Sequence, residues 1–322
     1  MAVPRLRTQE IEAQTLSGLA QRAQDSKGRD RDEPEDDLRT CFQRDRDRIV
    51  HCKAFRRLAH KTQVFLAPEG DHYRVRLTHT LEVTQVARTI ARALRLNEDL
   101  VEAICLGHDL GHTPFGHLGE EVVAGFLPGF KHNLQSVRIV EVIEDLNLTW
   151  EVRDGIANHT WSMPVPATLE GQVARFADRI AYVNHDIDDA VRARILAEED
   201  LPRETRGVLG TSPAERIHTT VRDLVSTSEG APDIAMSSAV SDAMASTREF
   251  LFRRVYVGRV GDQTREAVER VLVTLLEHYA TGRQTDPRVA AVDYVAGMTD
   301  RFAIRRFEEL SGGAFEGFGL LG

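Results

Sequence analysis

Residues 77–111 read LTHTLEVTQVARTIARALRLNEDLVEAICLGHDLG and decide the fold. In the first half of this stretch, side chains suited to a buried face recur at the spacing of an α-helix: His79, Val83, Val86 and Ile90. Asn97, followed by two acidic residues, is a typical N-cap, so a second helix is expected to begin at residue 98. Glycine and proline then interrupt the pattern in HDLGHTPFGH, residues 108–117, which we interpret as a helix end that runs into a tight loop.

Helical periodicity extends over most of the chain. Further helices are expected at roughly 41–60, 117–127, 133–146, 167–197, 213–227, 236–258, 263–281 and 286–310. Strand signals are confined to KTQVF at 61–65 and HYRVR at 72–76, which could pair around the intervening residues. The sequence therefore predicts an all-α protein with at most a small β-ribbon near residues 61–76.

The chain has 322 residues, enough for one large domain or two smaller ones. Residues 25–38, DSKGRDRDEPEDDL, are charged and contain glycine and proline, so we expect an exposed, mobile arm there. We divide the chain into an N-terminal helix and charged arm over 1–38, a single helical domain over 39–310 and a glycine-rich tail over 311–322. Within the helical domain, residues 230–310 are expected to complete the pocket.

Composition places the chain among soluble globular proteins, with 42% hydrophobic and 28% charged residues. No apolar run approaches the ~18 residues of a membrane span, so no membrane association is expected. The first residues, MAVPRLRTQEIEAQ, lack the apolar segment of a signal peptide. The three cysteines form no CxxC pair, which is typical of reduced thiols, and we expect a cytoplasmic protein. The net charge of −9 disfavours a general nucleic-acid-binding surface.

One stretch departs from this acidic balance. Residues 39–76 contain ten Lys and Arg against four Asp and Glu. Such a local excess of positive charge can concentrate an anion. The alternating RDRDR at 44–48 is typical of a solvated helix surface with paired charges, and composition alone favours this second interpretation.

Histidines cluster in the same part of the chain, with eight of the twelve between residues 51 and 132. His108 and Asp109 are adjacent at a helix end, and His79 lies on the buried face of the preceding helix, so the three side chains can converge on one metal ion. Imidazole and carboxylate ligands without thiolate suit Mn, Fe, Zn, Co or Ni, with Mg possible at the carboxylate-rich end.

A competing motif overlaps this one. His108 and His112 have the i, i+4 spacing of the zinc ligands on a metalloprotease helix, with Asp109 where such enzymes have glutamate. Gly111 and the Thr-Pro pair that follows His112 weaken the helix where the motif needs it to be continuous. We therefore disfavour a protease.

Longer blocks of sequence add a resemblance to a known family. They are QRDRDRIVHCKAFRRLAHKTQVF from residue 43, GDHYRVRLTHTLEV from 70, LGHDLGHTPFGHLGEE from 106, FKHNLQS from 130 and EGQVARFADRIAYVNHDIDDA from 170. In this order they resemble the deoxyguanosine triphosphate triphosphohydrolase family of HD-domain phosphohydrolases, in particular its bacterial dGTPase-like branch. The resemblance implies an all-helical HD fold that uses a divalent metal. It also implies hydrolysis of deoxynucleoside triphosphates (dNTPs), dGTP or several of them, to a deoxynucleoside and inorganic triphosphate.

The metal ligands of the family correspond to His79, His108, Asp109 and Asp178 in this sequence. Its catalytic histidine and the acidic partner correspond to His117 and Glu120. Because these two residues are three positions apart, they can touch on a helix and form a general acid/base dyad.

Relatives contact the substrate through residues that correspond to Gln63, Arg76, His112, His132, Arg179, Tyr182, Asp186, Arg248 and Tyr256. The resemblance implies that Arg76 and Arg248 bind phosphate and that Gln63 contacts the sugar 3′-hydroxyl. Tyr256 would pack against the sugar and exclude a 2′-hydroxyl. Asp178, Tyr182 and Asp186 are spaced i, i+4 and i+8, so one helix face would present all three to the pocket.

Other functions stay open at this point. The chain could be another HD phosphohydrolase that acts on a nucleoside monophosphate, a cyclic dinucleotide or an alarmone. It could also bind a nucleotide or single-stranded nucleic acid with weak turnover. The family further implies a homo-oligomer and, in some members, a nucleotide activator.

Overall fold

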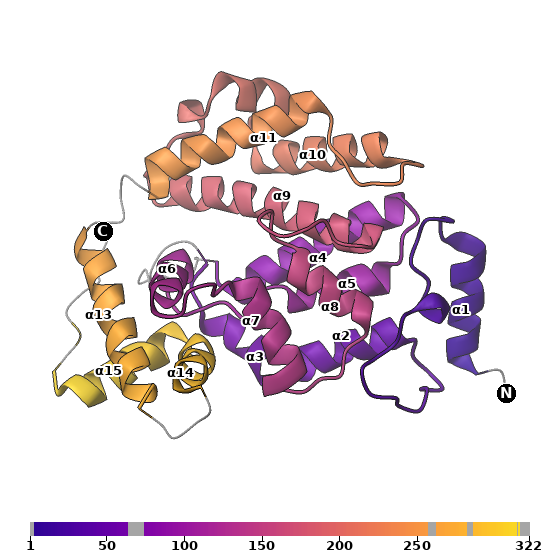
Figure 1. Cartoon of the computed structure of the whole chain (residues 1–322). Helices are drawn as coiled ribbons and strands as arrows, with labels where there is room; N and C mark the ends of the chain where they lie inside the picture. Colours follow the sequence, from indigo (N-terminus) through magenta and orange to yellow (C-terminus); the bar gives the residue numbers. More distant parts are fainter. Residues whose placement is uncertain (1–2, 64–73, 257–261, 282–285, 314, 316–322) are drawn as a thin grey trace.

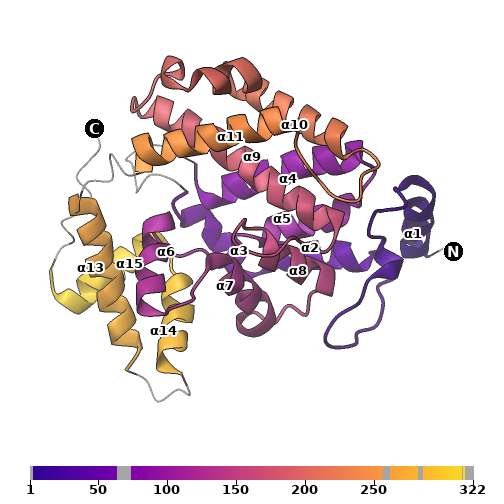
Figure 2. The same cartoon turned by 45° about the horizontal axis from the view of Figure 1, so that its top comes forward.

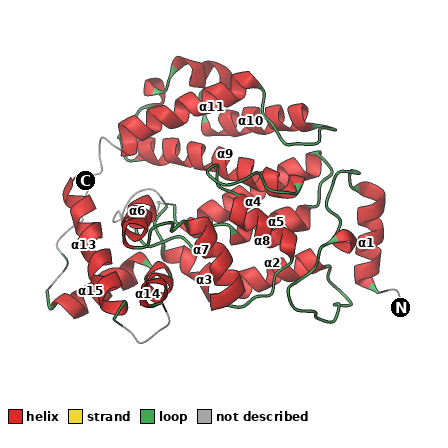
Figure 3. Ribbon diagram, in the orientation of Figure 1, coloured by secondary structure: helices red, strands yellow, loops and turns green. Residues whose placement is uncertain are grey.

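The computed structural model describes residues 3–63, 74–256, 262–281, 286–313 and 315. Within these ranges every regular element is helical and no strand occurs (Figure 3). The α-helices are α1 (Pro4–Thr15), α2 (Cys41–His51), α3 (Lys53–Arg57), α4 (Arg76–Ala93), α5 (Glu98–Gly107), α6 (Gly116–Phe126), α7 (His132–Arg138), α8 (Trp150–Asn158), α9 (Leu169–Arg192), α10 (Pro213–Ser228), α11 (Ser238–Leu251), α13 (Asp262–Tyr279), α14 (Pro287–Ala296) and α15 (Asp300–Ser311). The all-α prediction is confirmed.

The predicted β-ribbon is reduced to a single antiparallel bridge between Thr62 and Val75. The residues between the two expected strands, 64–73, lie outside the described residues. The backbone N–H of Arg76 also donates to the Lys61 carbonyl at 3.1 Å, so the two segments lie side by side where α4 begins.

Two groups of helices form the molecule (Figures 1 and 2). In the larger group α4 packs against both α5 and α9, α2 packs on α5, and α10 and α11 cover α9. The smaller group contains α13, α14 and α15, which pack on α6 through a separate hydrophobic cluster. The segment between α5 and α6, residues 108–115, therefore runs from one group to the other.

Local side chains explain where several helices begin. The predicted N-cap Asn97 accepts hydrogen bonds from the backbone N–H groups of Asp99 and Leu100 at 3.1 and 3.2 Å. The helix expected over 41–60 divides at Cys52, where the backbone is extended and Sγ accepts from Phe55 N–H. The helix expected over 286–310 also divides, because residues 297–299 form a turn and the Thr299 side chain caps α15. The helix α8 was not predicted.

The charged segment before α2 makes ion pairs with that helix. Arg29 pairs with the fully buried Asp45, and Glu33 pairs with Arg44 and Arg48. Asp45 also accepts from the N–H and hydroxyl of Thr149 at 2.8 and 2.7 Å, which ties α2 to the start of α8. None of the helices in the described ranges has an apolar run of the length needed to cross a bilayer.

The helices α5 and α8 approach each other through glycine. A Cβ atom added at Gly107 would lie 2.5 Å from Cδ1 of Ile156, and one added at Gly155 would lie 2.5 Å from Cδ1 of Ile104. The isoleucine of one helix thus packs directly against the glycine of the other. The two helix backbones lie closer together than larger residues at these positions would allow.

We expect Gly155→Ala to lower the free energy of unfolding by about 1–3 kcal/mol, measured by urea denaturation, because the methyl group would overpack Ile104. The matched control is Gly125→Ala on α6, where an added Cβ meets nothing within 4 Å. Gly125→Ala is expected to raise the free energy of unfolding by about 0.5–1 kcal/mol, because alanine favours the helix and makes the unfolded chain less flexible. Equal stabilisation by both changes would contradict the packing argument.

Candidate metal centre and active site

The four predicted metal ligands come from three mutually packed helices. His79 lies in α4, His108 and Asp109 directly follow α5, and Asp178 lies in α9. Nε2 of His79 lies 3.2 Å from Oδ1 of Asp178. Nε2 of His108 lies 3.6 Å from Oδ1 of Asp109 and 3.8 Å from Oδ1 of Asp178. The fold therefore brings all four side chains into one cluster.

These distances fit a single metal ion. Donor atoms at ~2.1 Å from an octahedral ion lie ~3.0 Å apart when adjacent and ~4.2 Å apart when opposite. Imidazole nitrogen and carboxylate oxygen are donors that suit Mn, Fe, Co, Ni and Zn. Nε2 of His108 is buried and has no hydrogen-bond partner among the described residues, although it lies beside two carboxylates. A metal ion would satisfy this nitrogen.

Hydrogen bonds outside the cluster set the tautomers of two ligands. Nδ1 of His108 lies 2.6 Å from the carbonyl oxygen of Cys105, so Nδ1 carries the proton and Nε2 the lone pair. Nε2 of His185 lies 3.0 Å from Glu82, and its Nδ1 lies 3.2 Å from Nδ1 of His79. When His185 donates to Glu82 it accepts from His79, which leaves Nε2 of His79 free to bind a metal.

His159, which directly follows α8, was not among the residues predicted from the sequence. Its Nδ1 lies 2.8 Å from the carbonyl oxygen of Ile156, and one of its nitrogens lies within 4.8 Å of donor atoms of both His108 and Asp178. Val152, Ile156 and His159 are spaced i, i+4 and i+7, so the face was present in the sequence. His159 becomes a candidate ligand, or a contact for a group bound to the metal.

Arg76 compensates the charge of Asp109. Its Nη1 lies 2.7 Å from Oδ2 of Asp109, and both side chains are buried. Burial alone would raise the pKa of Asp109, but His108 and Arg76 hold it well below its ordinary value. Nε and Nη2 of Arg76 have no hydrogen-bond partner among the described residues, so two buried donors remain beside the metal cluster.

A second group of polar side chains lies next to the metal cluster and contains His112, His117, Glu120 and His132. Glu120 accepts from the His132 backbone N–H at 2.9 Å and lies 2.9–3.0 Å from its Nδ1. Glu120 thus binds the first residue of α7, whose backbone N–H has no acceptor within its own helix. The dyad of His117 and Glu120 stays a prediction. His117 remains within 4.8 Å of the Glu120 carboxylate.

These histidines differ in proton affinity. Burial alone would lower the pKa of His132, but its hydrogen bond with Glu120 raises it. Although the His117 ring is accessible to solvent, the protein around it displaces most of its water, and together with Arg76 this lowers the pKa of His117 to about 4. His132 therefore binds a proton more readily than His117, whose ring is neutral at pH 7. Nε2 of His132 lies 3.2 Å from Nε2 of His159 and 4.0 Å from Asp109, which joins the two groups.

Helix α9 presents further polar residues one or two turns from Asp178. Tyr182 and Asp186 interact with each other, and the ring of Tyr182 lies 5.9 Å from that of His117, centroid to centroid. Arg179 lies over the ring of Trp161 at 4.5 Å. Burial and the nearby Arg248 lower the pKa of Arg179, which places α11 beside this face of α9.

Two predicted substrate contacts, Gln63 and Tyr256, are each the last described residue before a gap in the described ranges. Gln63 is buried, and its Oε1 has no hydrogen-bond partner among the described residues. Tyr256 ends the short π-helix Phe252–Tyr256, and its side chain lies outside the described residues.

Two segments of the chain match known protein families. Residues 76–183 match the HD domain, and residues 234–309 match the phosphohydrolase-associated domain. A deoxyguanosinetriphosphate triphosphohydrolase-like protein of Caldanaerobacter subterraneus subsp. tengcongensis is 52% identical over 320 residues, which cover 94% of each chain. One of Clostridium perfringens (strain SM101) is 49% identical over 92% of this chain and 94% of its own. A protein of the same name from Geobacter sulfurreducens is 40% identical, over 93% of this chain and 96% of its own length.

The chain belongs to the deoxyguanosinetriphosphate triphosphohydrolase-like family of HD-domain hydrolases. His79, His108, Asp109 and Asp178 all lie within the residues that match the HD domain, and His79, His108 and Asp109 are close enough to hold a metal ion. A crystal structure of a hypothetical protein from Aquifex aeolicus has a TM-score of 0.47 at 20% identity, over 81% of this chain and 67% of that one.

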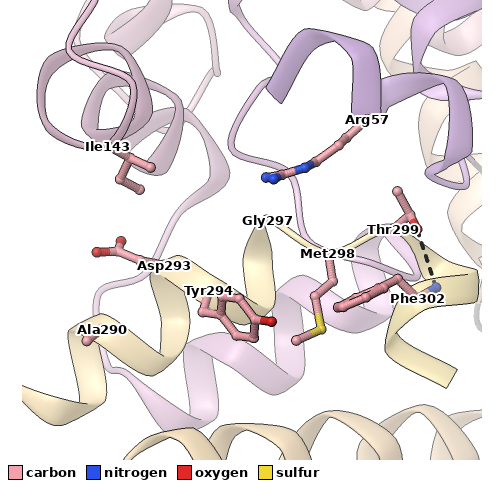
Figure 4. A pocket seen from close by; sticks show the side chains of 9 residues that line it. All are labelled: Arg57, Ile143, Ala290, Asp293, Tyr294, Gly297, Met298, Thr299 and Phe302. Carbon is pink, nitrogen blue, oxygen red and sulfur yellow. Dashed lines mark hydrogen bonds between the residues drawn. The ribbon is translucent and has the colours of Figure 1, made fainter. Parts of the chain in front are cut away.

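A cavity of about 600 Å³ lies elsewhere in this HD hydrolase, between α3 and the turn from α14 to α15 (Figure 4). Arg57, Asp293 and Tyr294 line it together with Met298 and Phe302, and none of the cluster histidines does. Asp293 is already paired with Arg138 at 2.6 Å. The candidate active site is therefore the polar cluster and not this cavity.

We expect Asp109→Asn to lower metal affinity by more than about 100-fold, because it removes a charged ligand from the cluster. The measurement is metal content per chain after gel filtration in buffer free of metal. The matched control is Asp188→Asn, which changes a carboxylate of α9 that pairs with Arg74 and Arg192. Equal metal retention in both variants would exclude Asp109 as a ligand.

Proposed function

We propose that this HD hydrolase converts dNTPs and water to deoxynucleosides and inorganic triphosphate, with a divalent metal ion held by His79, His108, Asp109 and Asp178. The observation that carries the proposal is Arg76, which neutralises Asp109 with one nitrogen and keeps two buried donors without a partner among the described residues. Donors beside a metal ion are suited to a triphosphate chain. The near full-length relatives with dGTP triphosphohydrolase-like names support the same substrate class.

In this reaction water adds to the α-phosphorus, and the bond from that phosphorus to the sugar 5′-oxygen breaks. The 5′-oxygen leaves with a proton, and the three phosphates stay together. A bound divalent ion would polarise a phosphoryl oxygen and make a coordinated water more acidic. The protein supplies the remaining parts: Arg76 binds and neutralises the phosphates, and nearby histidines exchange protons.

We assign the proton exchange with a reacting oxygen to His117, whose lowered pKa keeps the ring neutral at pH 7. His132 is held by Glu120, whose pKa is lowered to about 2 by its hydrogen bond with His132 although burial opposes this. The other nitrogen of His132, Nε2, lies 3.2 Å from His159, and a phosphate oxygen that accepts from it would replace this contact. His112 stacks on His132 with ring centroids 4.3 Å apart and extends the same wall.

The sugar is assigned to Tyr182, Asp186 and Gln63. The buried Oε1 of Gln63 needs a donor, and a sugar 3′-hydroxyl supplies one. Arg179 and Arg248 lie close together near Tyr182 and suit the outer phosphates. Exclusion of the 2′-hydroxyl by Tyr256 stays a prediction, as do the homo-oligomer, the cytoplasmic location and a nucleotide activator.

Product analysis tests the proposal. Purified protein is incubated with Mn²⁺ or Mg²⁺ and each dNTP or NTP, alone and mixed, and the products are resolved by anion exchange. We expect a deoxynucleoside and intact triphosphate. Orthophosphate or pyrophosphate instead of triphosphate would assign the chain to another HD phosphohydrolase reaction, and no turnover by the metal-loaded protein would refute the proposed substrate.

His117→Ala is expected to lower kcat by about 10²- to 10⁴-fold while metal content stays unchanged, since the residue moves a proton and does not bind the ion. The control is His218→Ala on α10, a histidine outside the cluster. Rates within twofold of wild type for His117→Ala would remove its assigned role.

A further inference from the structure

Lys61 is a buried lysine that the reaction does not use. Its side chain is 1% exposed, and its Nζ donates to the carbonyl oxygens of His112 and Ala296, the latter at 2.8 Å. Burial, with Arg76 nearby, lowers the pKa of Lys61 to about 7. His112 lies in the turn that leads to His117, and Ala296 is the last residue of α14.

Asp300 makes a second connection between the same two segments. Its Oδ1 accepts from the Phe115 backbone N–H at 3.0 Å. Its Oδ2 accepts from the Thr62 N–H at 2.9 Å and from the Thr62 hydroxyl. Asp300 is the first residue of α15 and is buried, so its carboxylate is fixed by that helix. Three chain segments, 61–63, 112–116 and 296–300, thus meet at two buried polar side chains, Lys61 and Asp300.

The turn that receives these bonds has an unfavourable backbone. Phe115 has φ of 64° and Gly116 has φ of 59°, and the left-handed conformation is strained for phenylalanine. The next residue is His117, in the first turn of α6. Contacts from outside the turn therefore have to maintain the conformation that aims His117 at the site.

The turn between α14 and α15 is well placed to supply these contacts. Gly297, Met298 and Thr299 join the helices, and Figure 4 shows them beside Arg57 at the outer cavity. The residues on either side of this turn, Ala296 and Asp300, make the two inward bonds. The helices α14 and α15 are anchored in the smaller hydrophobic group, so the bonds connect that group to the active site.

We propose that Lys61 and Asp300 are positioning residues, which hold the turn 112–116 against α14 and α15 and thereby fix His112 and His117 for catalysis. The proposal deepens the proposed function and rests on it for the role of His117. It also gives the phosphohydrolase-associated segment a role in catalysis that requires no contact between α14 or α15 and the substrate.

Asp300→Asn tests the proposal. An amide has one oxygen, so in either orientation its NH₂ group faces a backbone N–H of Phe115 or Thr62, and one bond is lost. We expect hydrogen–deuterium exchange of amides 112–117 to become about 10- to 100-fold faster. We also expect kcat to fall by about 10²-fold with metal content and KM within twofold of wild type. Lys61→Met should reproduce both effects.

The matched control is Asp45→Asn, because Asp45 is also a buried carboxylate that accepts from a threonine N–H and hydroxyl. It should lower stability without faster exchange at 112–117. If Asp300→Asn does not fold, Thr62→Val removes only the hydroxyl bond, and smaller changes of the same kind are expected. Unchanged exchange at 112–117 in a folded variant, or the same increase in Asp45→Asn, would overturn the proposal. A wild type without dNTP turnover would instead refute the proposed function, and exchange would still decide the positioning role.

Discussion

A carboxylate removed from water has to be compensated inside the protein, and Asp109 is the carboxylate around which this molecule is arranged. Its partner Arg76 begins α4, and His79 lies one turn later on the same helix. A single helix thus supplies both the compensating cation and a proposed metal ligand. For these groups to reach Asp109 and Asp178, α4 has to pack on α5 and α9 together, which is the central contact of the larger helix group.

Much of this could be predicted from the sequence because the signals are local. The periodicity of residues 77–111, the cap at Asn97 and the i, i+4, i+8 series on α9 depend on neighbours within two helical turns. The metal ligands carried over from the family meet in the structure for the same reason: each lies on or directly after a helix whose buried face was readable.

The parts that escaped prediction depend on distant residues. The bond of Glu120 with His132 was not predicted, because it depends on the unsatisfied N–H at the start of α7, 12 residues along the chain. No local sequence pattern marks Lys61 as a positioning residue, because one of its hydrogen-bond partners, Ala296, lies 235 residues away. His159 was not predicted for a different reason. The helix α8 is short and contains a glycine, so the sequence shows only a weak helical periodicity there.

The glycines at the contact of α5 and α8 have a consequence beyond packing. Gly107 directly precedes His108, and Ile156 lies three residues before His159. Because the helices touch through glycine on both sides, the imidazole rings of His108 and His159 lie 5.0 Å apart, centroid to centroid. The separation of the His108 and His159 rings is therefore set by two glycines, Gly107 and Gly155, which lie outside the cluster. In the proposed metal centre the preferred ion size would therefore follow from helix spacing, and it could change while every proposed ligand stays the same.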